Sequence, residues 1–542
     1  MDVNQDDYLE EVKHCMNAKD MVKTEILLEH LDLVDSKTQK KLIFELSKAD
    51  DDFSLLVLKK LILKKENIII AVPAIEQVFI SKFMGDSNKL IAFLNDEDLI
   101  KQRNLFIKIA AEIQSEDAIP ALIEIANNAT NDDEVVLLLK AFGDIGSPDA
   151  VNLITEHLYS NNRKIIITAI KALRKLATPY AIKRLADRMG TDQQLDLLIV
   201  DTFATIQDKV SLEKLNETLV AHSAFIRNYG KSKLVKIGAK VIPQLIENLL
   251  YDDPDLLIHT LNVLAEIGDK SAIAPIRKLL FNEPKDGNIR FAAYEALGLL
   301  PLDKSAYLLA EGLSDEVDNV RLAAAKAINK NYNKMLSIGI SNLLSGDEKE
   351  VKDIIIAVID SESDTIFVDK IEDEDFMKVA IKYLKDEVPD DLQKHFTDLL
   401  KKNGYNSIAT EIESSKKIDA GGSKIIFVVD DSRMILGIYR TTLHRLGYES
   451  VLFEFPADAI EKLKTEKPDL LITDLNMPEI TGVGLTEAAR KIYSKKELPI
   501  VMCTTQNEVQ DNDDAYSAGV DLIIHKPFTD ESIKTAIDQF KI

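Results

Sequence analysis

A motif with a period near 31 residues recurs along the chain, and this repeat constrains the fold more than any other feature. Its first segment aligns on seven positions whose successive spacings are 30 to 34 residues. These positions are Ala118, Ala150, Ala181, Ser211, Val241, Ala272 and Ala306. One copy of so short a repeat cannot bury its apolar face alone. Neighbouring copies must therefore stack and share a continuous core.

Each copy predicts a pair of helices joined by a short polar loop. Residues 119–126 carry apolar side chains at helical spacing, and residues 318–328 do the same for the second helix. Pro120 and Pro243 fall in the first turn of the first helix, where a missing N–H group costs nothing. Gly146 follows a second helix, as expected of a glycine C-cap. Each repeat is thus predicted to be a helical hairpin.

The repeats resemble the HEAT repeat superfamily, in particular its short, lyase-type members. Arg290 and Arg321 stand where that superfamily often has an arginine at the start of the second helix, and the resemblance covers about residues 50–345. It implies an all-α solenoid wound as a right-handed superhelix, whose ordinary use is to bind another protein. Tetratricopeptide repeats, with a period of about 34 residues, are the alternative, but their Trp/Gly/Tyr pattern is missing.

Residues 424–542 have a different pattern, in which short apolar runs alternate with helical stretches. The runs are 424–429, about 450–454, 470–473, 499–503 and 522–525. They are continuously apolar, as expected of parallel strands buried on both faces. This predicts a flavodoxin-like α/β domain with a parallel five-stranded sheet of order 2-1-3-4-5.

Polar residues follow these runs at the points where the strands should end. Asp430 with Asp431, Asp474, Thr504 and Lys526 are the residues concerned. Ligands bind at the carboxyl ends of the strands in such sheets. The carboxylates would repel one another there, so a hard divalent cation, Mg²⁺, is expected to complete the cluster. Asp474 is then the natural nucleophile for a phosphoryl group.

The phrases FVVDDSRMIL, LLITDLNMPEITG, PIVMCTTQ and AGVDLIIHKPF, in this order, resemble the receiver domain of two-component response regulators. The resemblance covers 424–542, and this segment is similar to the single-domain chemotaxis receivers. It implies that a histidine kinase phosphorylates Asp474. It also implies that Asp430, Asp431, Asp474 and the backbone carbonyl of Asn476 hold Mg²⁺.

The resemblance assigns two further residues and shows departures from the family at two positions, Ile523 and Thr505. At the second of these, alanine or glycine is commoner than threonine. Lys526, before a cis-prolyl bond at Pro527, is implied to pair with the phosphoryl oxygens. Thr504 is implied to offer its hydroxyl group to the phosphate and to move on activation. The family's usual aromatic switch residue is Ile523 here, so an aromatic rotamer switch is in doubt.

The composition excludes several classes of function. The formal net charge is −24, so nucleic acid is not expected as a partner, because binding it needs a basic face. The two cysteines, Cys15 and Cys503, predict a reducing compartment and no disulfide. The sequence shows neither a signal pattern nor an apolar stretch of about 18 residues, so membrane insertion is not expected and a cytoplasmic protein is.

These observations predict four parts and leave three hypotheses for function. The parts are an N-terminal helical cap (1–50), a HEAT-like solenoid (51–412), a flexible linker (413–423) and a receiver domain (424–542). The first hypothesis is a response regulator whose output is protein–protein interaction by the solenoid, with an unknown partner. The second is a phosphate sink or phosphorelay intermediate that the solenoid localises. The third is a solenoid enzyme regulated by phosphorylation, although no separate catalytic domain is expected.

Overall fold

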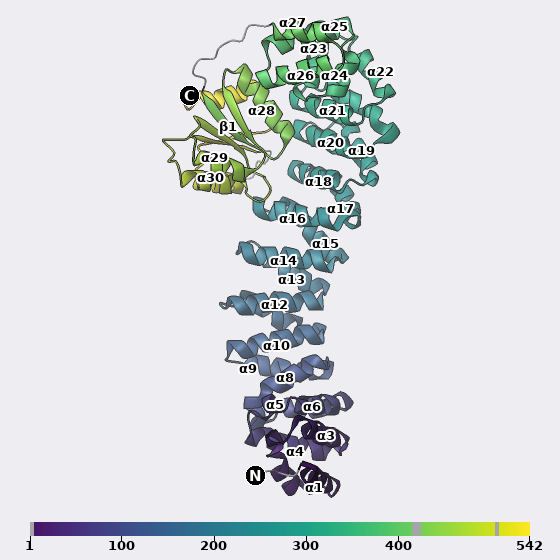
Figure 1. The fold of residues 1–542 in the computed structure, drawn as a ribbon, viewed down its shortest axis with the longest axis vertical. Coiled ribbons are helices and arrows are strands. Elements are labelled where there is room, and N and C mark those ends of the chain that lie inside the picture. Colours follow the sequence, from purple (N-terminus) through teal and green to yellow (C-terminus); the bar gives the residue numbers. More distant parts are fainter. Residues whose placement is uncertain (1–4, 415–423, 505–508) are drawn as a thin grey trace. The chain divides into compact units, whose positions relative to one another are not determined.

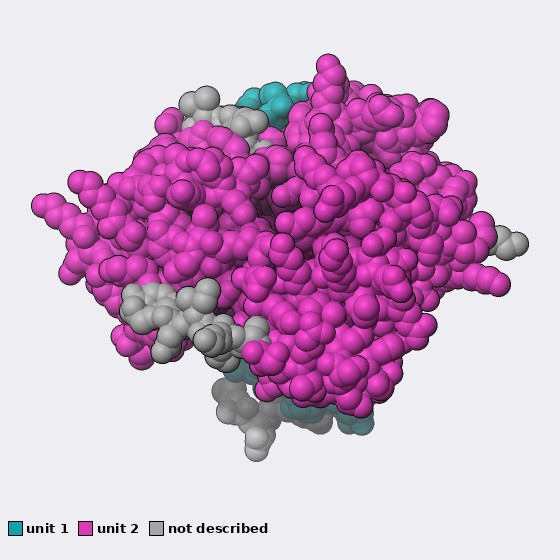
Figure 2. Space-filling model, turned by 90° about the horizontal axis from the view of Figure 1, so that it is seen from above, with its two compact units in different colours: residues 1–214 teal, residues 215–542 magenta. Residues whose placement is uncertain are grey.

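The structure, a computed structural model, describes residues 5–414, 424–504 and 509–542. It divides into two compact units, Met1–Lys214 and Leu215–Ile542, which Figure 2 shows in different colours. The predicted linker falls mainly on residues 415–423, which lie outside the described residues. The second unit contains both helical repeats and the predicted α/β domain.

The first unit is built of stacked helical hairpins (Figure 1). The second helices of successive repeats, α8, α10, α12 and α14, each contact the next one in the row. The helices are α1 (Gln5–Asn17), α2 (Met21–Leu28), α3 (Ser36–Lys48), α4 (Asp51–Lys64), α5 (Ile68–Ala71), α6 (Ala74–Gly85), α7 (Ser87–Leu94), α8 (Arg103–Glu112), α9 (Ile119–Asn128), α10 (Asp132–Ile145), α11 (Val151–Glu156), α12 (Arg163–Leu176), α13 (Pro179–Asp187) and α14 (Gln193–Ile206). Helix α15 (Lys209–Glu217) spans the division between the units.

The second unit continues the same arrangement of hairpins. Helices α16, α18, α20, α21, α23, α25 and α27 each contact the next in this order. The bounds are α16 (Ala224–Ile237), α17 (Ile242–Asn248), α18 (Pro254–Ile267), α19 (Ile273–Phe281), α20 (Gly287–Leu299), α21 (Asp318–Lys330), α22 (Lys334–Leu343), α23 (Glu348–Asp360), α24 (Asp364–Lys370), α25 (Glu374–Asp386), α26 (Asp390–Lys402) and α27 (Asn406–Glu413). The predicted helical repeats are confirmed.

Local sequence explains where these helices begin, end and pack. Asp and Asn side chains cap their N-termini, as Asp253 does by accepting a hydrogen bond from the N–H group of Leu256. Gly146 ends α10 with a φ of 83°, which favours glycine. Gly143 lets α10 approach α12, because a Cβ atom there would lie 2.9 Å from Cα of Ala172. The acidic loops of the sequence are therefore partly helix caps.

The rest of the second unit is an α/β domain with a parallel five-stranded sheet. Its strand order is β2-β1-β3-β4-β5, as predicted. The strands are β1 (Ile425–Val429), β2 (Glu449–Phe453), β3 (Leu470–Asp474), β4 (Ile500–Thr504) and β5 (Leu522–His525). The helices are α28 (Arg433–Arg445), α29 (Pro456–Leu463), α30 (Gly482–Arg490), α31 (Val509–Ala518) and α32 (Asp530–Asp538).

Helices cover both faces of this sheet and bury its strands. Side chains of α28 and α32 pack with one face in a core that includes Val428 and Ile472. Side chains of α29, α30 and α31 pack with the other face around Phe427 and Leu471. Burial on both faces explains why these strands are continuously apolar. Among the described helices, none combines the length and the apolar composition that crossing a bilayer requires.

Candidate functional site

The carboxyl ends of four strands bring the predicted polar residues together. Asp430 follows β1, Asp474 ends β3, Thr504 ends β4 and Lys526 follows β5. The Lys526 Nζ atom lies 2.7 Å from Oδ2 of Asp430 and 2.7 Å from Oδ1 of Asp474. All three side chains are largely buried, with 12%, 2% and 10% of their surfaces exposed. One ammonium group therefore joins two carboxylates at the centre of this edge.

Backbone groups fix the orientation of the two carboxylates. The N–H group of Ser432 donates to Oδ1 of Asp430 over 2.9 Å, and that of Asn476 donates to Oδ2 of Asp474 over 2.7 Å. The N–H group of Lys526 donates to the Thr504 carbonyl over 2.8 Å. The peptide bond from Lys526 to Pro527 is cis, as predicted. The Asp430 and Asp474 side chains are thus each held by the main chain just after their own strand, and the backbone of Lys526 is held by the end of β4.

The site carries more negative charge than Lys526 offsets. Burial raises the pKa of Asp430 to about 6, against the attraction of Lys526. Burial in the cavity, followed by repulsion from Asp474 and Asp430, raises the pKa of Asp431 to about 7. Burial lowers the pKa of the Lys526 ammonium group, but the attraction of the Asp430 and Asp474 carboxylates outweighs burial and raises it. A cation at this edge would relieve the repulsion.

Hard oxygen donors of this kind suit Mg²⁺. Asp430, Asp431 and Asp474 all line one cavity, as does Asn476. Within the described residues, however, no group of three Asp, Glu, His or Cys side chains is arranged to hold a metal as it stands. Lys526 bridges two of these carboxylates. A bound cation would therefore share them with the ammonium group, or shift it.

The two predicted switch positions occupy different environments. Thr504 is 2% exposed at the end of β4. Ile523 lies in the middle of β5, is partly buried and packs against the core that contains Met502. An isoleucine at this position fills the core and has no polar group with which to report on the site.

Helices of the solenoid form a second wall of the site. The cavity has a volume of about 580 Å³, and residues of α16, α18, α20 and α21 line it together with the acidic cluster. Arg227 on α16 donates from Nη2 to Oδ1 of Asn476 over 3.1 Å. Asn228 donates to the Met477 carbonyl over 2.9 Å. Two side chains of one solenoid helix thus bind the loop that follows Asp474.

Helix α20 contacts the other end of the site. Asn288 donates to the Lys526 carbonyl over 2.6 Å. Glu295, on the same helix, hydrogen-bonds with Ser432 and lines the cavity. Burial, and then repulsion from Asp430, raise the pKa of Glu295 to about 7. The solenoid therefore adds polar and acidic groups to an already acidic site.

Sequence reasoning found the acidic cluster and missed this solenoid wall. It did not identify the polar residues that α16 and α20 supply, which are Arg227, Asn228, Lys231, Asn288 and Glu295. One signal was available, because α16 carries four basic and no acidic residues in a strongly acidic chain. Arg290, at the start of its second helix, donates hydrogen bonds to Asp315 and to the Pro284 carbonyl in the loops beside that helix.

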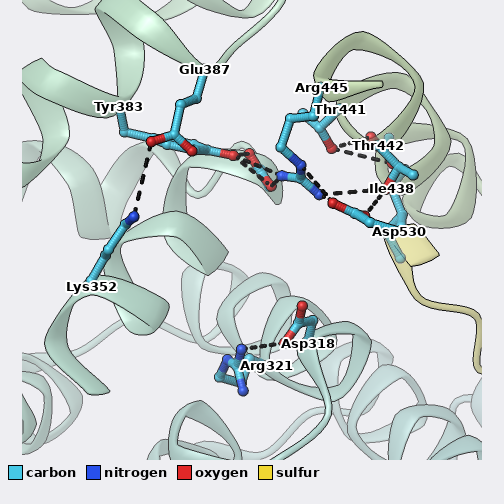
Figure 3. A network of polar contacts seen from close by, with 12 residues as sticks. Asp318, Arg321, Lys352, Tyr383, Glu387, Ile438, Thr441, Thr442, Arg445 and Asp530 are labelled. Carbon is cyan, nitrogen blue, oxygen red and sulfur yellow. Dashed lines mark hydrogen bonds and ion pairs between the residues drawn. The ribbon is translucent and has the colours of Figure 1, made fainter. Parts of the chain in front are cut away.

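A second contact joins the α/β domain to the solenoid away from the acidic cluster. Figure 3 shows Arg445 of α28 pointing between Tyr383 and Asp530. Its Nη1 atom lies 3.1 Å from the Tyr383 hydroxyl and 3.5 Å from Oδ2 of Asp360, and its Nε atom lies 3.0 Å from Oδ2 of Asp530. Asp360 also accepts from the Tyr383 hydroxyl over 2.9 Å. We call Arg445, Asp360, Tyr383 and Asp530 the interdomain cluster.

The α/β domain is doubly wound and has an aspartate pair bridged by a lysine at the carboxyl ends of its strands. These are the features of a receiver domain, and here it is joined to stacked helical hairpins. Residues 426–538 match the model of the response regulator receiver domain, and residues 242–329 match that of HEAT repeats. The chain belongs to the response regulator family, through a receiver domain of the CheY type.

Chemotaxis proteins are among its relatives. Chemotaxis protein CheY1 of Helicobacter pylori is 42% identical over 115 residues, which are 21% of this chain and 93% of that protein. The CheY homolog of Campylobacter jejuni is 38% identical over 115 residues, 21% of this chain and 88% of that protein. The solved chemotaxis response regulator CheY4 of Vibrio cholerae is 28% identical and covers 22% of this chain and 99% of its own, with a TM-score of 0.21.

Proposed function

We propose that the receiver domain accepts a phosphoryl group from a histidine kinase on Asp474 and that the HEAT-like solenoid delivers the output by binding another protein. The observation that carries the first part is the Lys526 ammonium group, 2.7 Å from both Asp430 and Asp474 at the carboxyl edge of the sheet. The second part is supported by the direct contact of solenoid helix α16 with the loop after Asp474. For the domains we propose residues 51–412 as the solenoid and 424–542 as the receiver.

The chemistry is an in-line transfer to a carboxylate. A carboxylate oxygen of Asp474 forms a bond to phosphorus as the P–N bond of the donor phosphohistidine breaks. The electron pair of that bond stays on the imidazole nitrogen. Lys526 balances the negative charge that the phosphoryl group brings into the buried site.

We assign the cation site to Asp430, Asp431, Asp474 and the backbone carbonyl of Asn476. When bound there, Mg²⁺ supplies positive charge near the phosphoryl oxygens. Burial, together with repulsion from Asp474, raises the pKa values of Asp430 and Asp431, and a bound cation would favour the ionised form of both. Thr504, at the end of β4, is proposed to contact the phosphoryl group through its hydroxyl. Because the switch position is Ile523, which packs in the core, we propose that no aromatic side chain changes its rotamer when Thr504 moves.

Intact mass measurement tests the proposal. The full chain is incubated with Mg²⁺ and either acetyl phosphate or a phosphorylated histidine kinase, and we expect an adduct of about 80 dalton. Asp474→Asn removes the nucleophile and should abolish the adduct. Asp458→Asn is the matched control, because Asp458 is an exposed carboxylate on α29. An unmodified wild-type chain, or equal labelling of D474N, would contradict the proposal.

The same material separates an interaction protein from a phosphate sink or relay member. The set of proteins that the full chain captures should change when D474N replaces the wild type or when a phosphoryl mimic is added. An unchanged set with rapid loss of the adduct would instead favour the sink or relay.

A further inference from the structure

One lysine of the solenoid lines the acidic cavity of the receiver. Lys231 lies on α16, one turn after Arg227, and shares the cavity with Asp431 and Asp474. Both of these carboxylates interact electrostatically with its ammonium group. In the part of the chain that the structure describes, Lys231 makes no hydrogen bond or ion pair, although Glu266 also interacts electrostatically with it. Burial, followed by repulsion from Arg227, lowers the pKa of Lys231 to about 8, so that its charged form still predominates at pH 7. Its charge is therefore available to a group that enters the cavity.

The neighbours of Lys231 hold it in place. Arg227 donates from Nη1 to the carbonyls of Ala221 and His222 and from Nη2 to Asn476. Asn228, next in sequence, binds the Met477 carbonyl. Helix α16 is thus attached to the loop after Asp474, one turn from Lys231. This attachment positions the Lys231 ammonium group, but the hydrogen bonds that make it do not involve that group.

The charges of the cavity favour a cation in this position. Its lining includes the receiver carboxyl groups of Asp430, Asp431 and Asp474, and two solenoid carboxyl groups, Glu266 and Glu295. Lys526 and Lys231 are the lysines of the described lining. A phosphoryl group adds a charge of about −1.5 to −2 and three acceptor oxygens. An ammonium group offers three donors to such oxygens.

We propose that Lys231 binds the phosphoryl group carried by Asp474, so that phosphorylation fastens the receiver to α16 of the solenoid. This inference rests on the proposed function and names the solenoid residue that senses its product. Lys526 contacts the phosphoryl group from the receiver, and Lys231 contacts it from the solenoid. The phosphoryl group then belongs to both domains.

Two acidic residues of the solenoid oppose this attraction, and the surroundings weaken their effect. Burial raises the pKa of Glu295 to about 7 and raises that of Glu266. Protonation of these groups is therefore easier than that of exposed glutamates, and a phosphoryl anion favours it further. Lys231 interacts electrostatically with Asp431 and Asp474, and also with Glu266. Glu295 interacts instead with Asp430, Lys526 and Ser432.

The experiment uses the full chain with Mg²⁺ and beryllium fluoride, which mimics a phosphoryl group on a carboxylate. Calorimetric titration gives the affinity for the mimic, and hydrogen exchange gives the protection of the α16 amides. The variants are Lys231→Met, which keeps the length of the side chain and removes its charge, and Lys231→Arg, which keeps the charge. Lys236→Met is the matched control, because Lys236 is an exposed lysine of the same helix.

We expect the mimic to bind K231M about tenfold more weakly than wild type, as the loss of one charge-assisted hydrogen bond predicts. The mimic should slow exchange of the α16 amides in wild type and K236M, and this slowing should disappear in K231M. K231R should recover most of it, because it restores a donor of the same charge.

Three results would overturn the inference, and only the third would also contradict the proposed function. Affinity and protection of K231M within twofold of wild type would exclude Lys231 while the Asp474 adduct still forms. Faster exchange of α16 after the mimic binds would show that the phosphoryl group separates the domains. A wild-type chain that takes neither mimic nor adduct would remove the proposed function together with the inference.

Discussion

Arg445→Met tests whether the interdomain cluster holds the receiver on the solenoid. The variant loses the guanidinium hydrogen bonds to Tyr383 and Asp530. It also removes the stronger of two counter-charges of Asp360, whose side chain is only 4% exposed, and leaves Arg440. We expect the free energy that favours docking of the receiver on the solenoid to fall by about 2 to 3 kcal/mol. The pKa of Asp360 sets most of this value.

The cost is smaller than the roughly 3 to 5 kcal/mol typical of a broken buried ion pair. Burial raises the pKa of Asp360 to about 6 even beside Arg445. At pH 7 the ionised form is then favoured by only about 1.4 kcal/mol, so protonation caps this part of the loss. The hydrogen bond to Tyr383 adds about 1 kcal/mol. The pair with Asp530 adds nothing to docking, because α28 and α32 both belong to the receiver and the pair persists when the two domains separate.

Hydrogen exchange of α23 and α28 amides, which the docked domains shield, measures this loss. Exchange should be roughly 30-fold faster or more in R445M than in wild type. Arg433→Met is the control on the same helix, because Arg433 is 83% exposed and pairs with Glu454 inside the receiver. In the R445M/D360N double variant, part of the loss should be recovered, since no buried charge is left alone. Exchange in R445M within threefold of that in R433M would refute the reasoning.

Three further predictions follow from single positions. The raised pKa of Asp360 means that the folded state binds this proton more tightly than the unfolded chain does, so the carboxylate destabilises the fold above pH 6 and the penalty disappears as the pH falls below about 4. The free energy of unfolding of D360N relative to wild type, measured in urea titrations, should therefore grow by about 2 to 3 kcal/mol between pH 4 and pH 7. A difference that stays constant with pH would be evidence against this prediction. Gly482→Ala would place a Cβ atom 2.1 Å from the Asp474 carbonyl oxygen; the loop after β3 must shift, so calorimetry should show loss of more than about 3 kcal/mol, and the idea fails if the receiver melts as in wild type. Phe106→Ala removes a fully buried ring that contacts three other phenylalanines, and should cost the first unit about 3 to 5 kcal/mol in denaturant titrations of the full chain, with unchanged phosphorylation of Asp474 as its control.

The strand ends of the receiver could be predicted because each depends on a local pattern. Continuous apolar runs mark strands buried on both faces, and the polar residue after each run must then lie at one edge of the sheet. Asp430, Asp474 and Lys526 met there as expected. The helical hairpins were predictable for the same reason, since apolar spacing and capping residues act within a few residues of one another.

The solenoid wall of the site could not be predicted in this way. Arg227 and Asn476 are 249 positions apart in the sequence, and each lies on a surface that its own repeat or strand pattern assigns to solvent. Periodicity shows which face of a helix enters the core of its own domain. It carries no information on which polar face a second domain will cover. Lys231 and Glu295 were missed because their partners lie across that boundary.

The attachment of α16 to the loop after Asp474 has a thermodynamic consequence. If a phosphoryl group stabilises one curvature of these repeats, any protein that grips the repeats in that curvature must raise the affinity of Asp474 for the phosphoryl group by the same factor. The target would then act as an effector of the regulator. The fraction of the regulator that is phosphorylated would therefore depend on the abundance of its target.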